Sequence, residues 1–274
     1  MTKRFLNLGC GHRRHPDWVN IDVGEGFAGV ISHDLRNGIP FPDKSFDVVY
    51  HSHVLEHIAK HEAPLFLKEC HRVLKDDGIF RIVVPDMELL ARNYLERLEE
   101  VRMRNDGECV NFEWSTIHFL DQMVRTSSGG EMARFLKERD ELDLDYIKKT
   151  CGPEVVEIAV TERDRNPTDE AKLNKNHTPK TKLSRLRFAF QRILFGKSFN
   201  KEQEIAKFRN TGEVHQWMYD EISLATLLSE CGFKNPSRKI ATDSAIENWC
   251  SFHLDTRDDG TIFHTDSLYM EAYR

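Results

Sequence analysis

The stretch LNLGCG at residues 6–11 decides the fold. A short run that suits a buried strand passes directly into Gly9 and Gly11, which one residue separates. Glycine tolerates positive φ and lets backbone N–H groups approach a ligand without a Cβ in the way. A strand that ends in such a turn is typical of the nucleotide-binding edge of an open parallel sheet. Because a single GxG occurs in many turns, the assignment depends on what the next strands carry.

The next two predicted strands each end near an aspartate. The strand at 18–23 ends around Asp22, and the strand at 28–32 is followed by Asp34. The carboxyl ends of parallel strands face one crevice, so both carboxylates are expected beside the glycine turn. Asp22 suits the two hydroxyls of a ribose, and Asp34 is placed to accept a hydrogen bond from an adenine amino group. Together these features predict a nucleoside site.

The rest of the first hundred residues continues this alternation of strands and helices. Strands are predicted over 46–50 and 79–84, separated by a helix over 62–74. Connections of this length are too long for hairpins and imply crossovers between parallel strands. We therefore predict a doubly wound α/β core. Four further elements are predicted along the chain, namely helices over 86–101 and 219–231 and strands over 239–242 and 267–272.

The middle of the chain breaks this alternation. Residues 1–101 and 212–274 are expected to form the sheet domain, with 102–211 inserted between them as helices and loops. Within the insertion, 112–150 look helical in patches. Residues 161–182 are so poor in apolar side chains that a long loop or a linker without fixed structure is predicted.

The composition excludes several classes of protein. The 274 residues suffice for one α/β domain with an insertion. The chain has no run of the ~20 apolar residues that a membrane span needs, and its N-terminus lacks the apolar stretch of a secretion signal. Its six scattered cysteines include no CxxC pair, which argues against a disulfide scaffold or a zinc ribbon. We therefore expect a cytoplasmic location.

The net charge of -6 hides one basic segment. Residues 172–209 contain eleven Lys and Arg against two Glu, so they carry +9 and the remainder carries -15. Within this segment, 181–196 can form a basic amphipathic helix. Such a helix either contacts an anionic membrane from the inner face or packs its apolar stripe on the core. No specific nucleic acid is expected, because the rest of the chain is acidic and carries no nucleic-acid motif.

Longer motifs extend the pattern of the glycine turn and the aspartates. They are LNLGCG (6–11), NIDV (20–23), HDLRNGIPFPDKSFDVVYHSHVLEHI (33–58) and ECHRVLKDDGIFRIVVPD (69–86). In order and spacing they resemble the class I S-adenosylmethionine-dependent methyltransferases, strongly over the first hundred residues and again at 212–233 and 267–272. The resemblance implies a Rossmann-like, mostly parallel seven-stranded sheet with an antiparallel last strand. It also implies S-adenosylmethionine as the cofactor.

The same resemblance assigns a cofactor site residue by residue. It places the methionine part at the glycine turn, the ribose at Asp22 and the adenine at Asp34, with the end of the fourth strand under the sulfonium. The implied cofactor-binding residues are Asn7, Leu8, Gly9, Cys10, Gly11, Asp22, Val23, Asp34, Leu35, His51 and Ser52. The chain departs from the family in two ways, since Asn7 replaces the usual acidic residue and HRRHP (12–16) replaces a third glycine.

Two other kinds of site compete with this interpretation. A dinucleotide site needs a third glycine near position 14 and an acidic residue about twenty residues on. Here Asp22 lies only eleven residues past Gly11. His53 and the following residues to His57 formally match the H-x-x-E-H of a group of zinc peptidases. No metal is predicted, because no further helical ligand is evident and the segment directly follows a strand of the cofactor fold.

The histidines are the candidates for chemistry. Methyl transfer from a sulfonium is an in-line displacement, so alignment supplies most of the catalysis. A hydroxyl acceptor must also lose a proton, and imidazole is the fitting base near neutral pH. His53 is the first candidate base, followed by His57 and His215. Two structural alternatives stay open, in which His57 packs at the start of a helix and Glu56 serves a helix N-terminus.

The predicted function is transfer of a methyl group from S-adenosylmethionine to an oxygen of a small-molecule, glycan-linked or lipid-linked acceptor. The acceptor class rests on the resemblance of GEVHQWMYD (212–220) and SLYMEA (267–272) to bacterial enzymes of surface-polysaccharide pathways. One alternative is methylation of nitrogen on a small metabolite or a protein. The other is a non-catalytic protein that binds the cofactor and docks a partner through its insertion.

Overall fold

The computed structural model describes residues 3–24, 28–104, 109–164 and 202–274. Its centre is one seven-stranded sheet with the strand order β3-β2-β1-β4-β5-β7-β6. The strands are β1 (Phe5–Leu8), β2 (Trp18–Asp22), β3 (Val30–Ser32), β4 (Phe46–Ser52), β5 (Leu74–Pro85), β6 (Lys234–Lys239) and β7 (Ser267–Tyr273). Only β7 pairs antiparallel, to β5 on one side and β6 on the other. The predicted fold class, including its antiparallel last strand, is confirmed.

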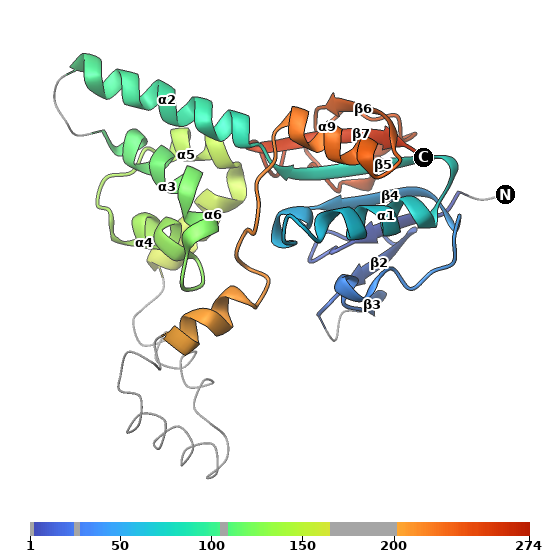
Figure 1. Ribbon diagram of the computed structural model, residues 1–274. Coiled ribbons are helices and arrows are strands. Elements are labelled where there is room, and N and C mark those ends of the chain that lie inside the picture. The colour runs from blue at the N-terminus through green and yellow to red at the C-terminus, as the bar shows by residue number, and fades with distance from the viewer. Residues whose placement is uncertain (1–2, 25–27, 105–108, 165–201) are drawn as a thin grey trace, which may run out of the picture.

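The helices fall into two groups (Figure 1). Helices α1 (Ala63–Val73) and α9 (Glu221–Glu230) lie along one face of the sheet. Helix α2 (Met87–Arg104) leads away from the end of β5 to a helical part made of α3 (Val110–Val124), α4 (Gly130–Glu138), α5 (Leu144–Cys151) and α6 (Pro153–Asp164). A short helix over residues 202–209 precedes the return to the sheet. Three 3₁₀ turns complete the described elements at Leu35–Asn37, Leu55–His57 and Trp249–Phe252.

The two faces of the sheet enter different cores, as the alternation of side chains along a strand requires. One face carries buried aliphatic residues such as Leu6 and Met270 and packs against α1 and α9. The other face carries Trp18 and Tyr50 and packs against Trp249 of the segment 240–262. That segment covers its face of the sheet with turns instead of an α-helix.

A buried arginine of β5 fixes this segment in place. The Arg81 guanidinium has no exposed surface and lies 2.8 Å from a carboxylate oxygen of Asp255 and 2.8 Å from one of Glu271. It also stacks 4.5 Å above the Trp249 ring. Paired guanidinium–carboxylate hydrogen bonds of this kind are strong and geometrically specific. They tie the segment 240–262 to the centre of the sheet.

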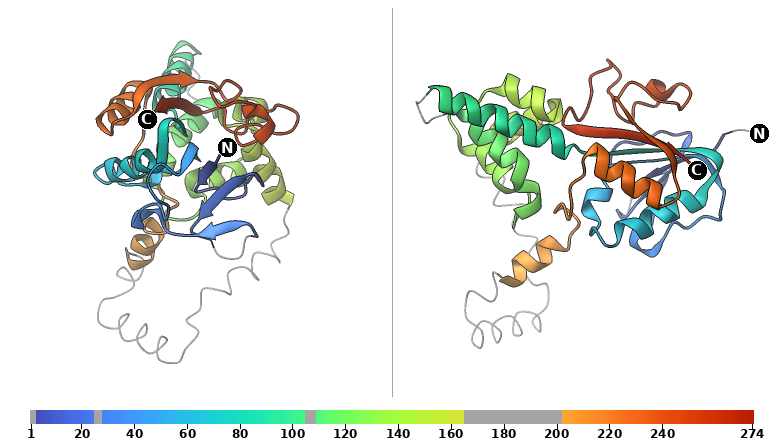
Figure 2. Two further views of the ribbon diagram at one scale, coloured as in Figure 1. Left: turned by 90° about the vertical axis from the view of Figure 1, so that its right-hand side faces the viewer. Right: turned by 45° about the horizontal axis from the view of Figure 1, so that its top comes forward.

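The helical part has a hydrophobic cluster of its own. Trp114, Phe135 and Ile147 are buried there among residues of α3–α6. Figure 1 and the right-hand view of Figure 2 show these helices beside the sheet, at the end where β5 passes into α2. Because β1, β4 and β5 are parallel, this is the carboxyl end of all three strands. The division into 1–101 plus 212–274 and 102–211 stays a prediction, and α2 continues across its first boundary to Arg104.

Other boundaries differ from the sequence prediction. The strand predicted over 239–242 lies instead at Lys234–Lys239, where an exposed edge strand needs no alternation of apolar residues. The loop predicted over 161–182 is wrong for its first four residues, which end α6. The rest of that predicted loop and the amphipathic segment 181–196 lie outside the described residues. Among the described residues, no helix is long and apolar enough to cross a bilayer.

Candidate functional site

The glycine turn lies between the carboxyl ends of β1 and β4. Gly9 and Gly11 have φ values of +61° and +50°, in the left-handed region that favours glycine. A Cβ on Gly9 would overlap the Val54 side chain just after β4, whereas a Cβ on Gly11 would meet no atom within 4 Å. Cys10 between them is buried, which raises the pKa of its thiol to about 11, and its N–H donates to Ile21 O at 3.1 Å. The turn is therefore packed at Gly9 and open at Gly11.

Asp22, the last residue of β2, closes this turn. Its Oδ2 accepts a hydrogen bond from the Gly11 N–H at 2.7 Å, and its Oδ1 accepts one from the Gly24 N–H at 3.3 Å. Each carboxylate oxygen has a second lone pair left for another donor. A fixed acceptor group beside an open stretch of backbone fits the hydroxyls of a ribose, so the residues present fit the predicted cofactor at this point.

Asp34 follows β3 at the same edge of the sheet. The backbone O of Asp22 accepts the His33 N–H at 2.9 Å, which holds the ends of β2 and β3 together. Asp34 caps the 3₁₀ turn that follows, and the Arg36 side chain bonds both of its carboxylate oxygens. The hydrogen bonds from Arg36 lower the pKa of Asp34. An adenine amino group at Asp34 must therefore share this carboxylate with Arg36.

The remaining predicted cofactor residues of the first strands differ in exposure. Asn7 and Leu8 are buried beneath the turn, and the Asn7 amide donates to Asn20 Oδ1 at 3.1 Å. Val23 is exposed beyond the end of β2, and Leu35 is half-buried against the core. Asn7 and Leu8 thus support the turn from below, whereas Val23 and Leu35 border the open side.

The prediction for the His51 side chain is wrong. Strand β4 runs on to Ser52, so His51 points into the helix-covered face, where its ring lies 5.3 Å from Phe66 and 5.5 Å from Phe80. It has no exposed surface, and burial lowers its pKa to about 4. Only Ser52, the next residue, is half-buried at the end of the strand. The His51 imidazole therefore belongs to the core and not beneath the sulfonium.

His53 occupies the first position beyond β4. Its φ is +54°, a conformation that costs a non-glycine residue of order 1 kcal/mol and recurs at functional sites. Its Nδ1 lies 3.0 Å from Glu56 Oε1 and its Nε2 lies 3.1 Å from Ser267 Oγ. Burial disfavours the charged imidazole, but the Glu56 carboxylate outweighs burial and raises the pKa of His53. The side chain keeps 23% of its surface exposed, so a ligand can reach it.

Glu56 is a buried partner of this imidazole. It lies in the 3₁₀ turn Leu55–His57, as the helix-terminus interpretation allowed, but its carboxylate has no exposed surface and faces His53. Burial alone would raise its pKa, yet His53 and the neighbouring imidazoles lower it to about 2. The backbone O of Glu56 accepts the Gln216 N–H at 2.6 Å. This turn is therefore bonded to the segment that returns from the helical part.

His57 and His215 lie side by side next to Glu56, with ring centroids 4.8 Å apart. The His57 Nδ1 is 3.4 Å from Val214 O, which agrees with the packing role left open for this residue. His215 is almost fully buried, and burial lowers its pKa to about 4. The structure thus brings all three predicted catalytic histidines around one carboxylate, with His53 on its open side.

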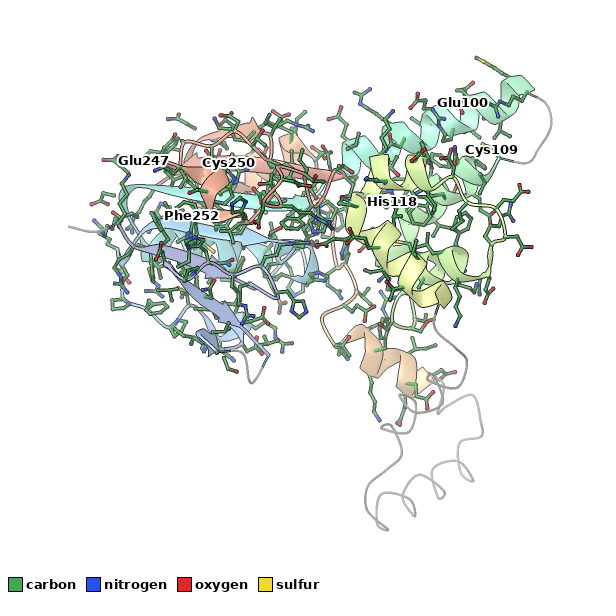
Figure 3. All side chains as sticks on the ribbon, turned by 180° about the vertical axis from the view of Figure 1, so that it is seen from behind. Glu100, Cys109, His118, Glu247, Cys250 and Phe252 are labelled. Carbon is green, nitrogen blue, oxygen red and sulfur yellow. The ribbon has the colours of Figure 1, made fainter. Side chains whose placement is uncertain are left out.

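A second polar network connects His53 to the helical part. His118 of α3 lies on the side of the helices that faces the sheet (Figure 3), and its Nε2 is 2.9 Å from Asp266 Oδ2. Cys151 Sγ is 3.4 Å from the same nitrogen. Burial opposes the charged imidazole, but Cys151 and Asp266 raise the pKa of His118 to about 10. Ser267, the partner of His53, follows Asp266 directly in the chain.

Arg13 closes the site from the side of the glycine turn. Its guanidinium donates to His264 Nε2 at 2.7 Å and to a carboxylate oxygen of Glu154 at 2.6 Å. A guanidinium cannot accept a hydrogen bond, so His264 Nε2 carries no proton. The His264 ring lies 4.1 Å from the ring of His53. The glycine turn, helix α6 and the candidate base are therefore coupled through one arginine.

Comparison with known proteins relates the first strands to a known domain. Residues 6–82 match the family model described as methyltransferase domain. This part of the chain is similar to S-adenosylmethionine-dependent methyltransferases. A probable S-adenosylmethionine-dependent methyltransferase of Mycolicibacterium smegmatis is 31% identical over 99 residues, which cover 30% of this chain and 37% of that relative. The chain thus spans little more than a third of that curated relative.

Two solved structures align over nearly the whole chain with low similarity. A SAM-dependent methyltransferase from Archaeoglobus fulgidus is 12% identical, covers 99% of this chain and 86% of its own, and has a TM-score of 0.38. A possible histamine N-methyltransferase from Thermotoga maritima is 10% identical, covers 100% and 83%, and has the same TM-score of 0.38. At such values the fold assignment depends on the strand order and not on these neighbours. The match to a methyltransferase domain and the name of the curated relative support the predicted cofactor, S-adenosylmethionine.

Several residues of the candidate site escaped the sequence interpretation. Ser267, Asp266 and His264 precede or begin β7, more than two hundred residues after His53 in the chain. No local pattern marks them, because their role depends on the antiparallel pairing of β7 with β5. The burial of His51 could have been predicted from the alternation of side chains along β4. It lies two residues after the core residue Val49 and therefore points to the same face of the sheet.

Proposed function

We propose that this methyltransferase transfers the methyl group of S-adenosylmethionine to a hydroxyl oxygen of a small-molecule, glycan-linked or lipid-linked acceptor. When bound, the cofactor supplies an electrophilic methyl group on its sulfonium. The observation that carries the proposal is the fixed, partly exposed imidazole of His53 at the carboxyl end of β4. The cofactor turn and Asp22 lie at the neighbouring ends of β1 and β2.

In this proposal His53 takes the proton of the acceptor hydroxyl at Nε2. Its Nδ1 faces Glu56, so the carboxylate sets the ring orientation and stabilises the positive charge that forms. The Ser267 hydroxyl, now 3.1 Å from Nε2, has a second partner in Asp266 Oδ1 at 3.5 Å. Rotation of that hydroxyl to Asp266 leaves Nε2 free for the acceptor. Methylation of a nitrogen that is already unprotonated needs no such proton acceptor, which is why oxygen is favoured.

Two contacts bring helices next to the site. Arg13 bonds Glu154 of α6 as well as His264, and His118 of α3 bonds Asp266. Exclusion of water by these helices would support transfer over hydrolysis. The glycan-linked or lipid-linked class of acceptor rests only on the resemblance of residues 212–220 and 267–272 to polysaccharide-pathway enzymes.

The test uses S-adenosylmethionine with a ¹³C-labelled methyl group and extracts of bacterial cell-envelope material. We expect a labelled product whose methyl carbon has the NMR shift of an ether, and a loss of about 100-fold or more in rate for His53→Ala. The matched control is His61→Ala, because His61 is exposed on the same loop. A product methylated at nitrogen contradicts the oxygen assignment, and an undiminished rate for His53→Ala excludes it as the base.

Cofactor binding is tested separately from turnover. Asp22→Ala removes the acceptor that holds the Gly11 N–H and faces the open side of the turn. We expect calorimetry to show S-adenosylmethionine bound by the wild type and by His53→Ala, and severely weakened binding by Asp22→Ala. Equal affinity in the Asp22→Ala variant would remove Asp22 from the site. Binding without any methylated product would favour the non-catalytic alternative.

A further inference from the structure

We propose that Glu56, His57 and His215 form a binding site for one divalent metal ion of the zinc type. One ligand atom from each residue lies within 4.8 Å of the ligand atoms of the other two. Glu56 and His57 belong to the turn after β4, whereas His215 belongs to the segment that returns from the helical part. A metal ion here would join these two segments next to His53.

The donor set is appropriate for such an ion. One carboxylate and two imidazoles are a recurring set of three protein ligands for Zn²⁺, with a fourth position left for water or another group. The ligands of a tetrahedral zinc site lie about 3.4 Å from one another, given metal–ligand distances near 2.0–2.1 Å. The present separations therefore require the three side chains to close in by roughly 1 Å. The sequence shows no further ligand on a helix, but His215 lies on an irregular segment and can supply the third ligand.

His57 has a backbone contact of the kind that metal-binding histidines make. Its Nδ1 is 3.4 Å from Val214 O, and a proton on Nδ1 leaves the lone pair on Nε2. Histidines that bind metals usually donate their other ring nitrogen to a backbone carbonyl or a carboxylate, which fixes the tautomer. Here the acceptor carbonyl belongs to Val214, the residue just before His215. The same segment thus orients the His57 ring and supplies His215 as a second ligand.

Glu56 provides an independent observation that points to a ligand. Its carboxylate has no exposed surface, and in the described part of the chain neither oxygen receives a hydrogen bond of good geometry. The contact with His53 Nδ1 at 3.0 Å involves Oε1. A buried carboxylate is costly unless it is paired or coordinates a metal. One oxygen can thus hold His53 while the carboxylate coordinates the ion through the other.

A second trio of possible ligands is less suited to a metal. His118, Cys151 and Asp266 also approach one another within 4.8 Å, and all three are buried. Their polar atoms already have partners, because His118 Nε2 lies 2.9 Å from Asp266 Oδ2 and 3.4 Å from Cys151 Sγ. The contacts within this trio therefore link the helical part to the sheet without a metal ion. The trio is the competing site in the test.

The experiment titrates the chelator-treated, full-length protein with Zn²⁺ by calorimetry. We expect one ion per chain and affinities at least 100-fold lower for His57→Ala and for His215→Ala. The isosteric variant Glu56→Gln, which keeps the volume of the buried side chain, should show the same loss. The matched control His61→Ala replaces an exposed histidine of the same loop and should bind Zn²⁺ as the wild type does. Cys151→Ser should also keep the site.

Two further readouts do not depend on enzyme activity. Zn²⁺ at about 100-fold excess over its Kd should raise the Tm of the wild type by roughly 5 °C or more, and that of His215→Ala not at all. Co²⁺ in place of Zn²⁺ should give d–d absorption without a thiolate-to-metal charge-transfer band. The proposal is overturned by the absence of Zn²⁺ binding, by binding that survives both histidine substitutions, or by a thiolate band that disappears in Cys151→Ser. None of these results bears on methyl transfer, so the two proposals stand or fall separately.

Discussion

Replacing each glycine of the cofactor turn by alanine tests the geometry of this turn directly. Both residues have positive φ, so alanine pays about 1–2 kcal/mol at either position for the left-handed conformation. At Gly11 the new Cβ meets no atom within 4 Å, and this cost is all we expect. At Gly9 the Cβ overlaps the Val54 side chain, which adds an overpacking cost of about 1–3 kcal/mol. Gly9→Ala should therefore destabilise the protein by about 2–5 kcal/mol and Gly11→Ala by about 1–2 kcal/mol.

The assay is urea unfolding without cofactor, read as the change in the free energy of unfolding. Val54→Ala, alone and combined with Gly9→Ala, completes a double-mutant cycle. Removing the overlapping methyl groups should return the steric part of the loss, so the double variant should be more stable than the sum of the single effects predicts. The same cycle with Gly11→Ala should be additive. Equal losses for the two glycines, or an additive Gly9/Val54 cycle, would refute the packing of this turn against β4.

Three further predictions concern the parts that hold the site. Arg81→Met leaves two buried carboxylates without their partner, so urea unfolding should show a loss of about 3–5 kcal/mol, and a loss below 1 kcal/mol would contradict the network around Arg81. Asp220→Ala removes the side chain that caps α9 and should cost about 1 kcal/mol by the same assay, whereas Asp220→Asn should cost less. The pKa of His118 is raised in the folded state to about 10, so its stabilising contribution is complete below the unfolded pKa near 6.5 and is lost as pH rises toward 10. The stability of the wild type relative to His118→Gln should fall over that interval, and a constant difference would show that the contact with Asp266 is not a charged one.

The positions of the glycine turn and the two aspartates were predictable because their signals are local. The apolar run before Gly9, the strand that ends at Asp22 and the strand before Asp34 each act within a few residues, and the parallel sheet then aligns their ends. The candidate base His53 was predictable for the same reason, since it follows the strand that lies next to β1.

The other half of the site depends on contacts between distant parts of the chain. Glu56 has a buried carboxylate whose surroundings include His57 from its own turn and His215 from beyond the helical part. Ser267 reaches His53 only because β7 enters the sheet in the reverse direction. The edge strand β6 was misplaced because its exposed residues, KNPSRK, show no alternation that burial would have imposed.

The helical part leaves and rejoins the sheet at a single place. Asp86 and Tyr219 form an isolated parallel bridge, and the Met87 N–H donates to Tyr219 O at 2.9 Å. The chain leaves the sheet and returns to it at residues that are hydrogen-bonded to each other. The pairing of the strands therefore does not depend on how many residues lie between these two points. Outside this place the segment contacts the sheet domain through separate side-chain pairs, among them His118 with Asp266 and Glu154 with Arg13. We therefore expect that evolution can change the length of the segment without disturbing the strands, as long as these pairs are kept.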